Sequence, residues 1–167
     1  MTENPLTYSD LPATGGQVHA VGTIWATMLW DLTWDLIDVY GFDEDMFNGT
    51  GGNNIAMQLV LDGMKLQPCA PGFESGRDAI IEADELASGG ANKCLIWETF
   101  ARRGLGFTAT QGSSSSVSDG TAAFDIPVEC ENLGINDTNL DNKFIIYPNQ
   151  SNGNINIKPL LDFGDAN

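Results

Sequence analysis

The sequence predicts a mainly α protein, an array of about four helices followed by an irregular strap and a short β-hairpin at the C-terminus. Apolar residues recur at helical spacing along most of the chain up to Gly106. Proline and glycine pairs separate these periodic segments. Beyond Gly106, serine, threonine and glycine dominate and the helical periodicity stops. The length of 167 residues fits one domain, or one domain and part of another.

The strongest helical pattern covers residues 18–40. Apolar side chains recur along one face of this segment: Trp25, Leu29, Leu32, Leu36 and Val39. Further apolar residues widen that face: Trp30, Trp34 and Ile37. The remaining strip carries the carboxylates of Asp31, Asp35 and Asp38. We therefore expect a central helix that is buried on most sides and turns one narrow acidic edge toward water.

Three shorter helices are expected to follow, at residues 54–67, 73–87 and 93–103. Pro68 and Pro71 stop the first of them, and Gly89-Gly90 closes the second. Asn92 stands where it can cap the last helix. Residues 1–16, which contain two prolines and a Gly-Gly pair, are expected to be loop.

The composition divides the chain into a helical lobe at 1–127, a polar linker at 128–142 and an incomplete β-type domain at 143–167. In the last part, β-prone runs at 144–147 and 154–158 flank a Pro-Asn…Asn-Gly turn. A two-stranded hairpin is barely stable alone in water, so we expect it to be the start of a larger domain.

The charge balance excludes several classes of partner. Seven Lys and Arg against 23 Asp and Glu give a formal net charge of −16, which repels nucleic acids and anionic lipid surfaces. The longest apolar stretch, 21–36, is interrupted by Asp31 and Asp35, so we expect no membrane insertion. The first residues, MTENPLTYSDLPATGG, contain neither a basic nor an apolar segment, so an export signal would have to lie outside this sequence.

No complete active site is present in the sequence. His19 is the only histidine and there is no CxxC pair, which argues against a self-contained zinc site. The serine run at 113–116 lacks a base to activate a nucleophile and is better explained as part of the strap. Asp43, Glu44 and Asp45 suggest calcium, but the DxDxDG spacing of a calcium loop is absent.

Cys69 and Cys94 flank the predicted helix at 73–87 and could be joined by one disulfide in an oxidising compartment. Buried free thiols are the alternative for the same residues. We predict that these two cysteines pair, which leaves Cys130 unpaired in the polar tail.

Several blocks of the chain closely resemble the C-terminal lobe of fungalysin-type zinc metalloendopeptidases, distant relatives of thermolysin. In order along the chain, the blocks are VHAVGTIWATMLWDLTWDLID, AMQLVLDGMKLQPC and GRDAIIEADELASGGANKCLIWETFARRGLG. The resemblance extends over residues 4–127. It implies a secreted enzyme that acts on proteins or peptides.

In that family two histidines of an HExxH helix and a later glutamate hold the zinc, and the HExxH glutamate is the general base. This chain has no HExxH, so the resemblance implies that the ligands belong to a missing N-terminal lobe and that this chain alone is inactive. It also implies a catalytic role for His19 as donor to the oxyanion of the transition state. An upstream aspartate can orient this ring in the family, whereas here position 14 is Thr14 and the nearest acid is Asp10. The alternative is a helix-start histidine that hydrogen-bonds its own loop.

The tail NKFIIYPNQSNGNINIK resembles the first hairpin of the sorting domain that directs bacterial proteins through type IX secretion. Pro148-Asn149-Gln150 stands where that domain usually has Pro-Asn-Pro. The resemblance implies a secreted or surface-attached bacterial protein. A second hypothesis, from another class, is a non-catalytic acidic helical module that binds or supports other molecules at the surface.

Overall fold

The computed structural model describes residues 4–131 and the two strands at 144–147 and 156–159. The chain divides into two compact units, Met1–Cys130 and Glu131–Asn167. Residues 128–130, which the composition assigned to a linker, fall in the first unit. Within the described part of the chain, no helix combines the length and apolar character needed to cross a membrane.

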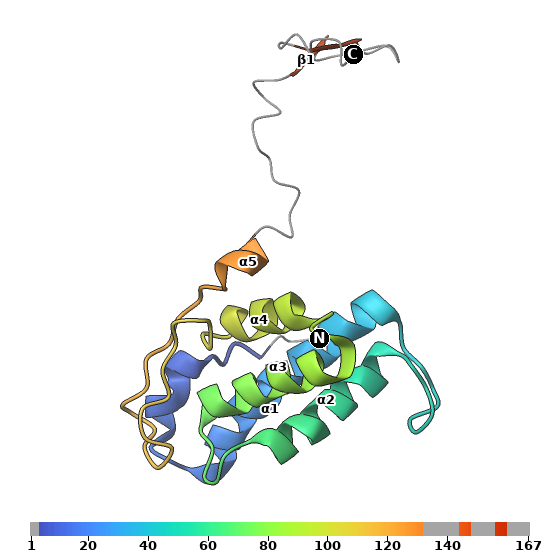
Figure 1. Ribbon diagram of the computed structural model, residues 1–167. Coiled ribbons are helices and arrows are strands. Elements are labelled where there is room, and N and C mark those ends of the chain that lie inside the picture. Colours follow the sequence, from blue (N-terminus) through green and yellow to red (C-terminus); the bar gives the residue numbers. More distant parts are fainter. Residues whose placement is uncertain (1–3, 132–143, 148–155, 160–167) are drawn as a thin grey trace. The chain divides into compact units, whose positions relative to one another are not determined.

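The first unit is helical, as predicted (Figure 1). Its elements are the 3₁₀ helix η1 (Tyr8–Thr14) and the α-helices α1 (Val18–Tyr40), α2 (Gly52–Leu66), α3 (Phe73–Ser88), α4 (Lys93–Arg102) and α5 (Val128–Glu131). The four long helices begin and end within two residues of the sequence-based bounds. Two short elements were not foreseen: η1 lies in the expected N-terminal loop, and α5 in the expected linker.

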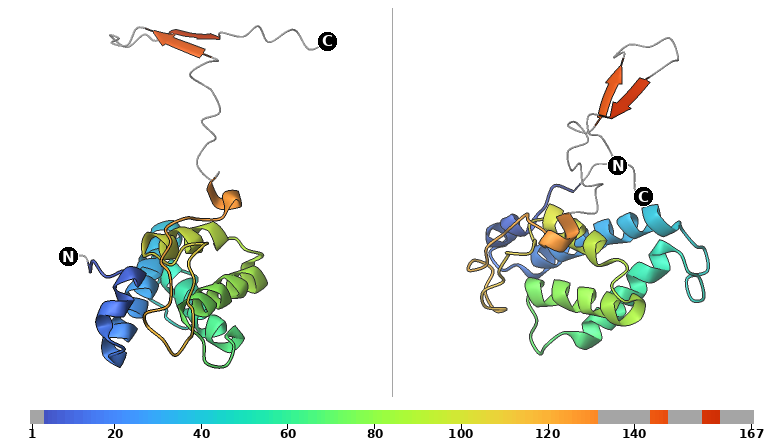
Figure 2. Two further views of the ribbon diagram at one scale, coloured as in Figure 1. Left: turned by 90° about the vertical axis from the view of Figure 1, so that its left-hand side faces the viewer. Right: turned by 45° about the horizontal axis from the view of Figure 1, so that its top comes forward.

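Helix α1 is the centre of the array, which confirms the prediction made from its apolar pattern. It contacts η1, α2 and α4, while α3 packs on α2 and α4 (Figures 1 and 2). Four α1 side chains are almost completely buried: Ile24, Met28, Leu32 and Leu36. They belong to the same buried core as Ile80 of α3 and Ile96 and Phe100 of α4. Trp25 and Leu29 are partly buried against the same core.

The expected acidic edge of α1 was wrong for Asp31 and Asp35, whereas Asp38 is exposed as predicted. The Asp31 carboxylate accepts hydrogen bonds from Arg103 Nε at 2.6 Å and Nη2 at 3.2 Å. Asp35 accepts from Arg102 Nη2 at 2.7 Å and from the Thr99 hydroxyl. Both aspartates therefore face α4 and the residue after it, because the arginines there satisfy their charge. The face of α1 that water reaches carries Trp30 and Trp34 instead.

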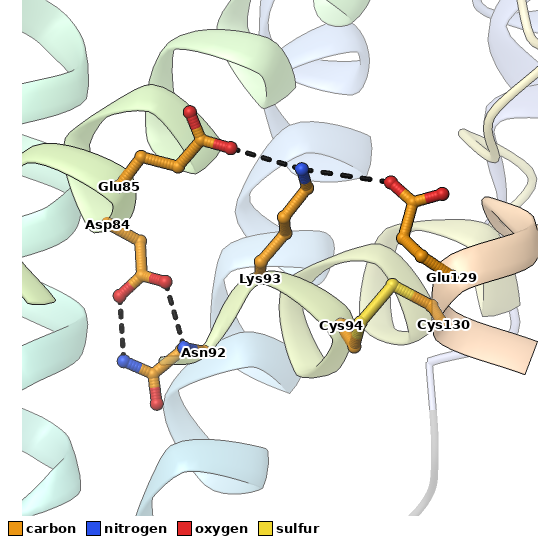
Figure 3. Close-up of a disulfide and its surroundings, with 7 residues drawn as sticks. All are labelled: Asp84, Glu85, Asn92, Lys93, Cys94, Glu129 and Cys130. Atoms are coloured by element: carbon orange, nitrogen blue, oxygen red, sulfur yellow. Dashed lines mark hydrogen bonds and ion pairs between the residues drawn. A yellow bond between two sulfur atoms is a disulfide. The ribbon is translucent and has the colours of Figure 1, made fainter. Parts of the chain in front are cut away.

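A buried carboxylate joins the end of α3 to the start of α4. Asp84 is fully buried and accepts from Asn92 N and from Asn92 Nδ2, each at 2.8 Å (Figure 3). It also accepts from Ser88 Oγ at 2.8 Å. Asn92 in turn accepts from the Tyr40 hydroxyl at 2.7 Å, which links α1 to the same network. Asn92 does occupy the N-cap of α4, but its side chain makes no capping bond because Asp84 and Tyr40 engage it.

We expect Asp84→Asn to lower the free energy of unfolding by about 1–3 kcal/mol, because one carboxylate oxygen becomes an NH₂ group that faces buried donors. Urea unfolding of the chain measures this change. Asp38→Asn is the matched control, an exposed α1 residue whose replacement should change stability by less than about 0.5 kcal/mol. Equal midpoints for the two variants would contradict the proposed contribution of the network.

The disulfide prediction was wrong. Cys94 pairs with Cys130, with Cα atoms 5.1 Å apart (Figure 3). Cys69 is an exposed free thiol. The reason is the path of the strap between α4 and α5, which returns the chain to α4. Backbone pairing of Leu105 with Ala123 and of Thr110 with Thr121 folds the strap on itself. Lys93, with Glu85 at 3.1 Å and Glu129 at 3.7 Å, adds ion pairs beside the disulfide.

The described part of the second unit is an antiparallel pair of strands, β1 (Phe144–Tyr147) and β2 (Asn156–Pro159). Phe144 is opposite Pro159 and Tyr147 is opposite Asn156. The expected hairpin is therefore present, with its second strand displaced by a residue or two. The turn with Pro148-Asn149-Gln150 lies outside the described residues.

Candidate functional site

His19 is the second residue of α1, and its side chain is exposed to solvent. Two glycines with positive φ angles precede the helix, Gly15 at 60° and Gly16 at 78°, a conformation that glycine adopts without strain. Gln17 then caps the helix by accepting the Ala20 N–H at 2.7 Å. The Gly-Gly-Gln sequence thus starts α1 abruptly and leaves His19 projecting from its first turn.

The imidazole of His19 has no hydrogen bond or ion pair within the described residues; only its backbone carbonyl is engaged, by the Thr23 hydroxyl at 2.8 Å. Asp10 is not available to orient the ring, because its carboxylate accepts from the Thr7 N–H at 2.8 Å and caps η1. Thr14 is engaged too, since its hydroxyl donates to the Leu11 carbonyl at 2.7 Å. The ring is therefore available to an external group.

The exposed face of α1 continues from His19 toward the end of the helix. At about 100° per residue, positions 22, 23, 26, 30, 33, 34, 37 and 40 fall within roughly 60° of the line through residue 19. None of these positions is charged; they carry Gly22, Thr23, Ala26, Trp30, Thr33, Trp34, Ile37 and Tyr40, of which Thr33 and Ile37 are only partly exposed. The apolar pattern predicts Trp30 and Trp34 on the buried face, but both are exposed. Asp31 and Asp35, which were expected to face water, are instead partly covered by Arg103 and Arg102.

A cavity of about 300 Å³ borders the first two turns of α1. Its aromatic wall consists of Tyr8, Trp25 and Phe73, with ring centroids of Phe73 lying 5.3 Å from Tyr8 and 5.5 Å from Trp25. Burial raises the pKa of Tyr8, whose hydroxyl donates to the Thr110 carbonyl at 3.1 Å. The serine run contributes to the same wall through Ser113, Ser114 and Ser116, and no histidine lines the cavity.

A larger hollow, of about 880 Å³, is far from His19. It is lined by Tyr40, Met46, Phe47 and residues of α2 and α3. Tyr40 is the last residue of α1, so about 32 Å of helix separates this hollow from His19. It carries no part of the candidate site.

Within residues 4–131 and the two described strands, no group of three or more His, Cys, Asp or Glu side chains is arranged to hold a metal ion. The acidic loop at Asp43 and Asp45 uses its carboxylates internally. Asp43 accepts from the N–H groups of Asp45 and Thr50 at 2.9 and 3.1 Å. Hydrogen bonds from the N–H groups of Asn48 and Phe47 lower the pKa of Asp45.

Residues 1–109 match the protein family described as Fungalysin metallopeptidase (M36). Curated relatives include Extracellular metalloproteinase 10 of Coccidioides posadasii, 46% identical over 77% of this chain, and Extracellular metalloproteinase mep of Aspergillus niger, 46% identical over 77%. A third, Extracellular metalloproteinase of Pyrenophora tritici-repentis, is 47% identical over 74%. The match covers 20%, 21% and 19% of these relatives, so the chain spans about a fifth of their length.

Proposed function

Since this chain belongs to the fungalysin metallopeptidase (M36) family, we propose that it is the C-terminal lobe of a secreted zinc-dependent endopeptidase. It forms one wall of the cleft that receives a protein or peptide substrate. The observation that carries this proposal is His19, an exposed imidazole without a partner among the described residues, at the start of a central helix. The relatives named as extracellular metalloproteinases support the secreted location.

The residues described here do not fit a resident zinc ion, and a chain with one histidine cannot contain HExxH. In the proposal, the metal ligands and the general base belong to a preceding lobe of the same enzyme. That lobe supplies the activated water, and this chain supplies binding surface and a hydrogen-bond donor.

The role proposed for His19 follows from where charge develops during peptide hydrolysis. Attack of water on the scissile carbonyl places negative charge on the carbonyl oxygen. An imidazole N–H that faces this oxygen donates a hydrogen bond that strengthens as the charge grows, and so lowers the barrier more than it stabilises bound substrate. Helix α1 holds the ring at a defined place, and its lack of an internal partner keeps the N–H available.

The proposal is tested by reading the coding sequence upstream of Met1. We expect an in-frame HExxH motif followed by a glutamate ligand. An upstream stop codon or an unrelated domain would contradict it and would favour the second hypothesis, a non-catalytic acidic module.

The 167-residue chain alone is expected to show no peptidase activity, because it carries neither the zinc ligands nor the base. The measurement is hydrolysis of a casein-type substrate with added zinc, with the complete enzyme as the positive control. Turnover by the isolated chain that disappears with a chelator would contradict the proposal that the zinc ligands and the base lie outside this chain.

For the tail, we propose the start of a type IX sorting domain, with the β1–β2 pair as its first hairpin. Support comes from the antiparallel register and from the resemblance of residues 142–158. Removing residues 132–167 in a bacterium with that pathway should leave the protein inside the cell envelope. Unchanged secretion after the deletion would contradict this assignment.

A further inference from the structure

The cavity beside the first two turns of α1 combines aromatic rings with uncharged polar side chains. We call it the aromatic hollow and define it by six of its lining residues: Tyr8, Gln67, Trp25, Phe73, Gln111 and Ser114. The strap, gold in Figure 1, runs beside η1 and contributes the last two of these. None of the described residues that line the hollow is charged, although the net charge of the chain is −16. Its volume of about 300 Å³ is at the lower end of the range of small-molecule sites, so it suits a small uncharged ligand.

Two rings of the hollow offer apolar surface to a ligand. Tyr8 is covered, at 3% exposed, whereas Trp25 and Phe73 are only partly buried. The Trp25 and Phe73 rings meet edge to face with centroids 5.5 Å apart. Trp25 also lies against Gly76, where an added Cβ would be 2.9 Å from the indole, so the ring is held at a place that only glycine leaves free. The negative face of a fixed aromatic ring attracts the slightly positive C–H groups on one side of a sugar ring.

The polar groups of the hollow can both donate and accept hydrogen bonds. Gln67 follows the last residue of α2, and its side-chain amide has no partner in the part of the chain that the structure describes. Gln111 Oε1 accepts from Ser75 N at 3.0 Å and from Ser75 Oγ at 3.1 Å, which leaves its NH₂ group free of described protein partners. Ser114 adds an exposed hydroxyl. Amides and hydroxyls match the hydroxyl groups of a sugar, which also donate and accept, whereas an ammonium only donates and a carboxylate only accepts.

We infer that the aromatic hollow binds a neutral saccharide unit, with one side of the sugar ring against Trp25 and Phe73 and its hydroxyl groups bonded to Gln67 and Gln111. Trp25 is about 120° around α1 from His19, so this site is separate from the proposed oxyanion donor. The inference does not rest on the proposed function, because every residue that forms the hollow belongs to this chain.

Saturation-transfer-difference NMR with the 167-residue chain tests the inference, with glucose and N-acetylglucosamine as probes. We expect transfer to the ring C–H groups of at least one of them, with a Kd in the millimolar range. Glucuronate, tetramethylammonium and N-acetylphenylalaninamide are the comparison probes and should bind more weakly. Tighter binding of tetramethylammonium would indicate a cage for cations, and tighter binding of N-acetylphenylalaninamide a site for an apolar side chain. Either result, tighter binding of glucuronate, or no transfer to either sugar would overturn the inference.

Two variants place the binding in the hollow. Gln67→Ala should weaken sugar binding about three- to tenfold, the scale for one hydrogen bond between neutral groups. Ser114→Tyr should abolish binding, because the larger side chain fills the hollow. Gln58→Ala is the matched control, since Gln58 belongs to the same helix, is exposed and donates to Asp62 at 2.6 Å outside the hollow. It should bind sugar like the wild type. Sugar binding that Gln67→Ala leaves unchanged would overturn the inference, and this variant decides if Ser114→Tyr does not fold.

Discussion

Replacing His19 by alanine in the complete enzyme is expected to lower kcat on the order of a hundredfold or more, the scale for one donor to a developing oxyanion. KM should change little, because the hydrogen bond strengthens mainly as negative charge forms on the carbonyl oxygen. Zinc content and folding should stay near wild type, since the ring has no contact within the described residues that folding depends on.

The experiment is steady-state peptide hydrolysis by the purified variant after its zinc content has been confirmed as stoichiometric. Val18→Ala is the matched control, because Val18 precedes His19 in the same turn and is 73% exposed. It should retain wild-type kcat. His19→Asn retains an N–H donor on a short side chain and should lose less activity than His19→Ala. Wild-type kcat in a fully zinc-loaded His19→Ala enzyme would contradict the catalytic role of His19 and leave it as a residue that only begins the helix.

Removing the Cys94–Cys130 disulfide is expected to destabilise the first unit strongly, because the bridge closes a long loop and Cys130 is buried in the core. The bridge joins cysteines separated by 36 residues. For a loop of this length, chain entropy predicts a loss of about 4 kcal/mol at 25 °C. The loop contains α4 and the strap, so its release should also free α5 from α4.

Urea unfolding of Cys94→Ser combined with Cys130→Ser measures this loss against the oxidised wild type. Cys69→Ser is the control and should change stability by less than about 0.5 kcal/mol, because Cys69 is exposed and free. Reduced wild-type protein should unfold at the midpoint of the double variant. A peptide map that links Cys69 to Cys94, or no stability loss in the double variant, would contradict the pairing described here.

The sequence was sufficient for the elements whose causes are local. The bounds of α1 were predictable because Gly15-Gly16 and Gly41 bracket one uninterrupted periodic segment. Proline after α2 and the Gly89-Gly90 pair after α3 acted in the same way. His19 was found because it is the only imidazole and follows a glycine turn into a helix. The His19 imidazole has no partner among the described residues, which is consistent with its selection as a candidate site residue. The sequence alone could not show this.

Only the tertiary structure shows which residues far apart in the chain contact one another. The apolar pattern of α1 fits more than one rotation of the helix. Arg102 and Arg103 select the observed one by pairing with Asp35 and Asp31, and this turns Trp30 and Trp34 outward. Cys94 is nearer in sequence to Cys69 than to Cys130, but the return of the strap brings Cys130 to it. Periodicity and turn residues act over one or two turns of chain, whereas ion pairs and disulfides depend on where the folded backbone brings distant residues together.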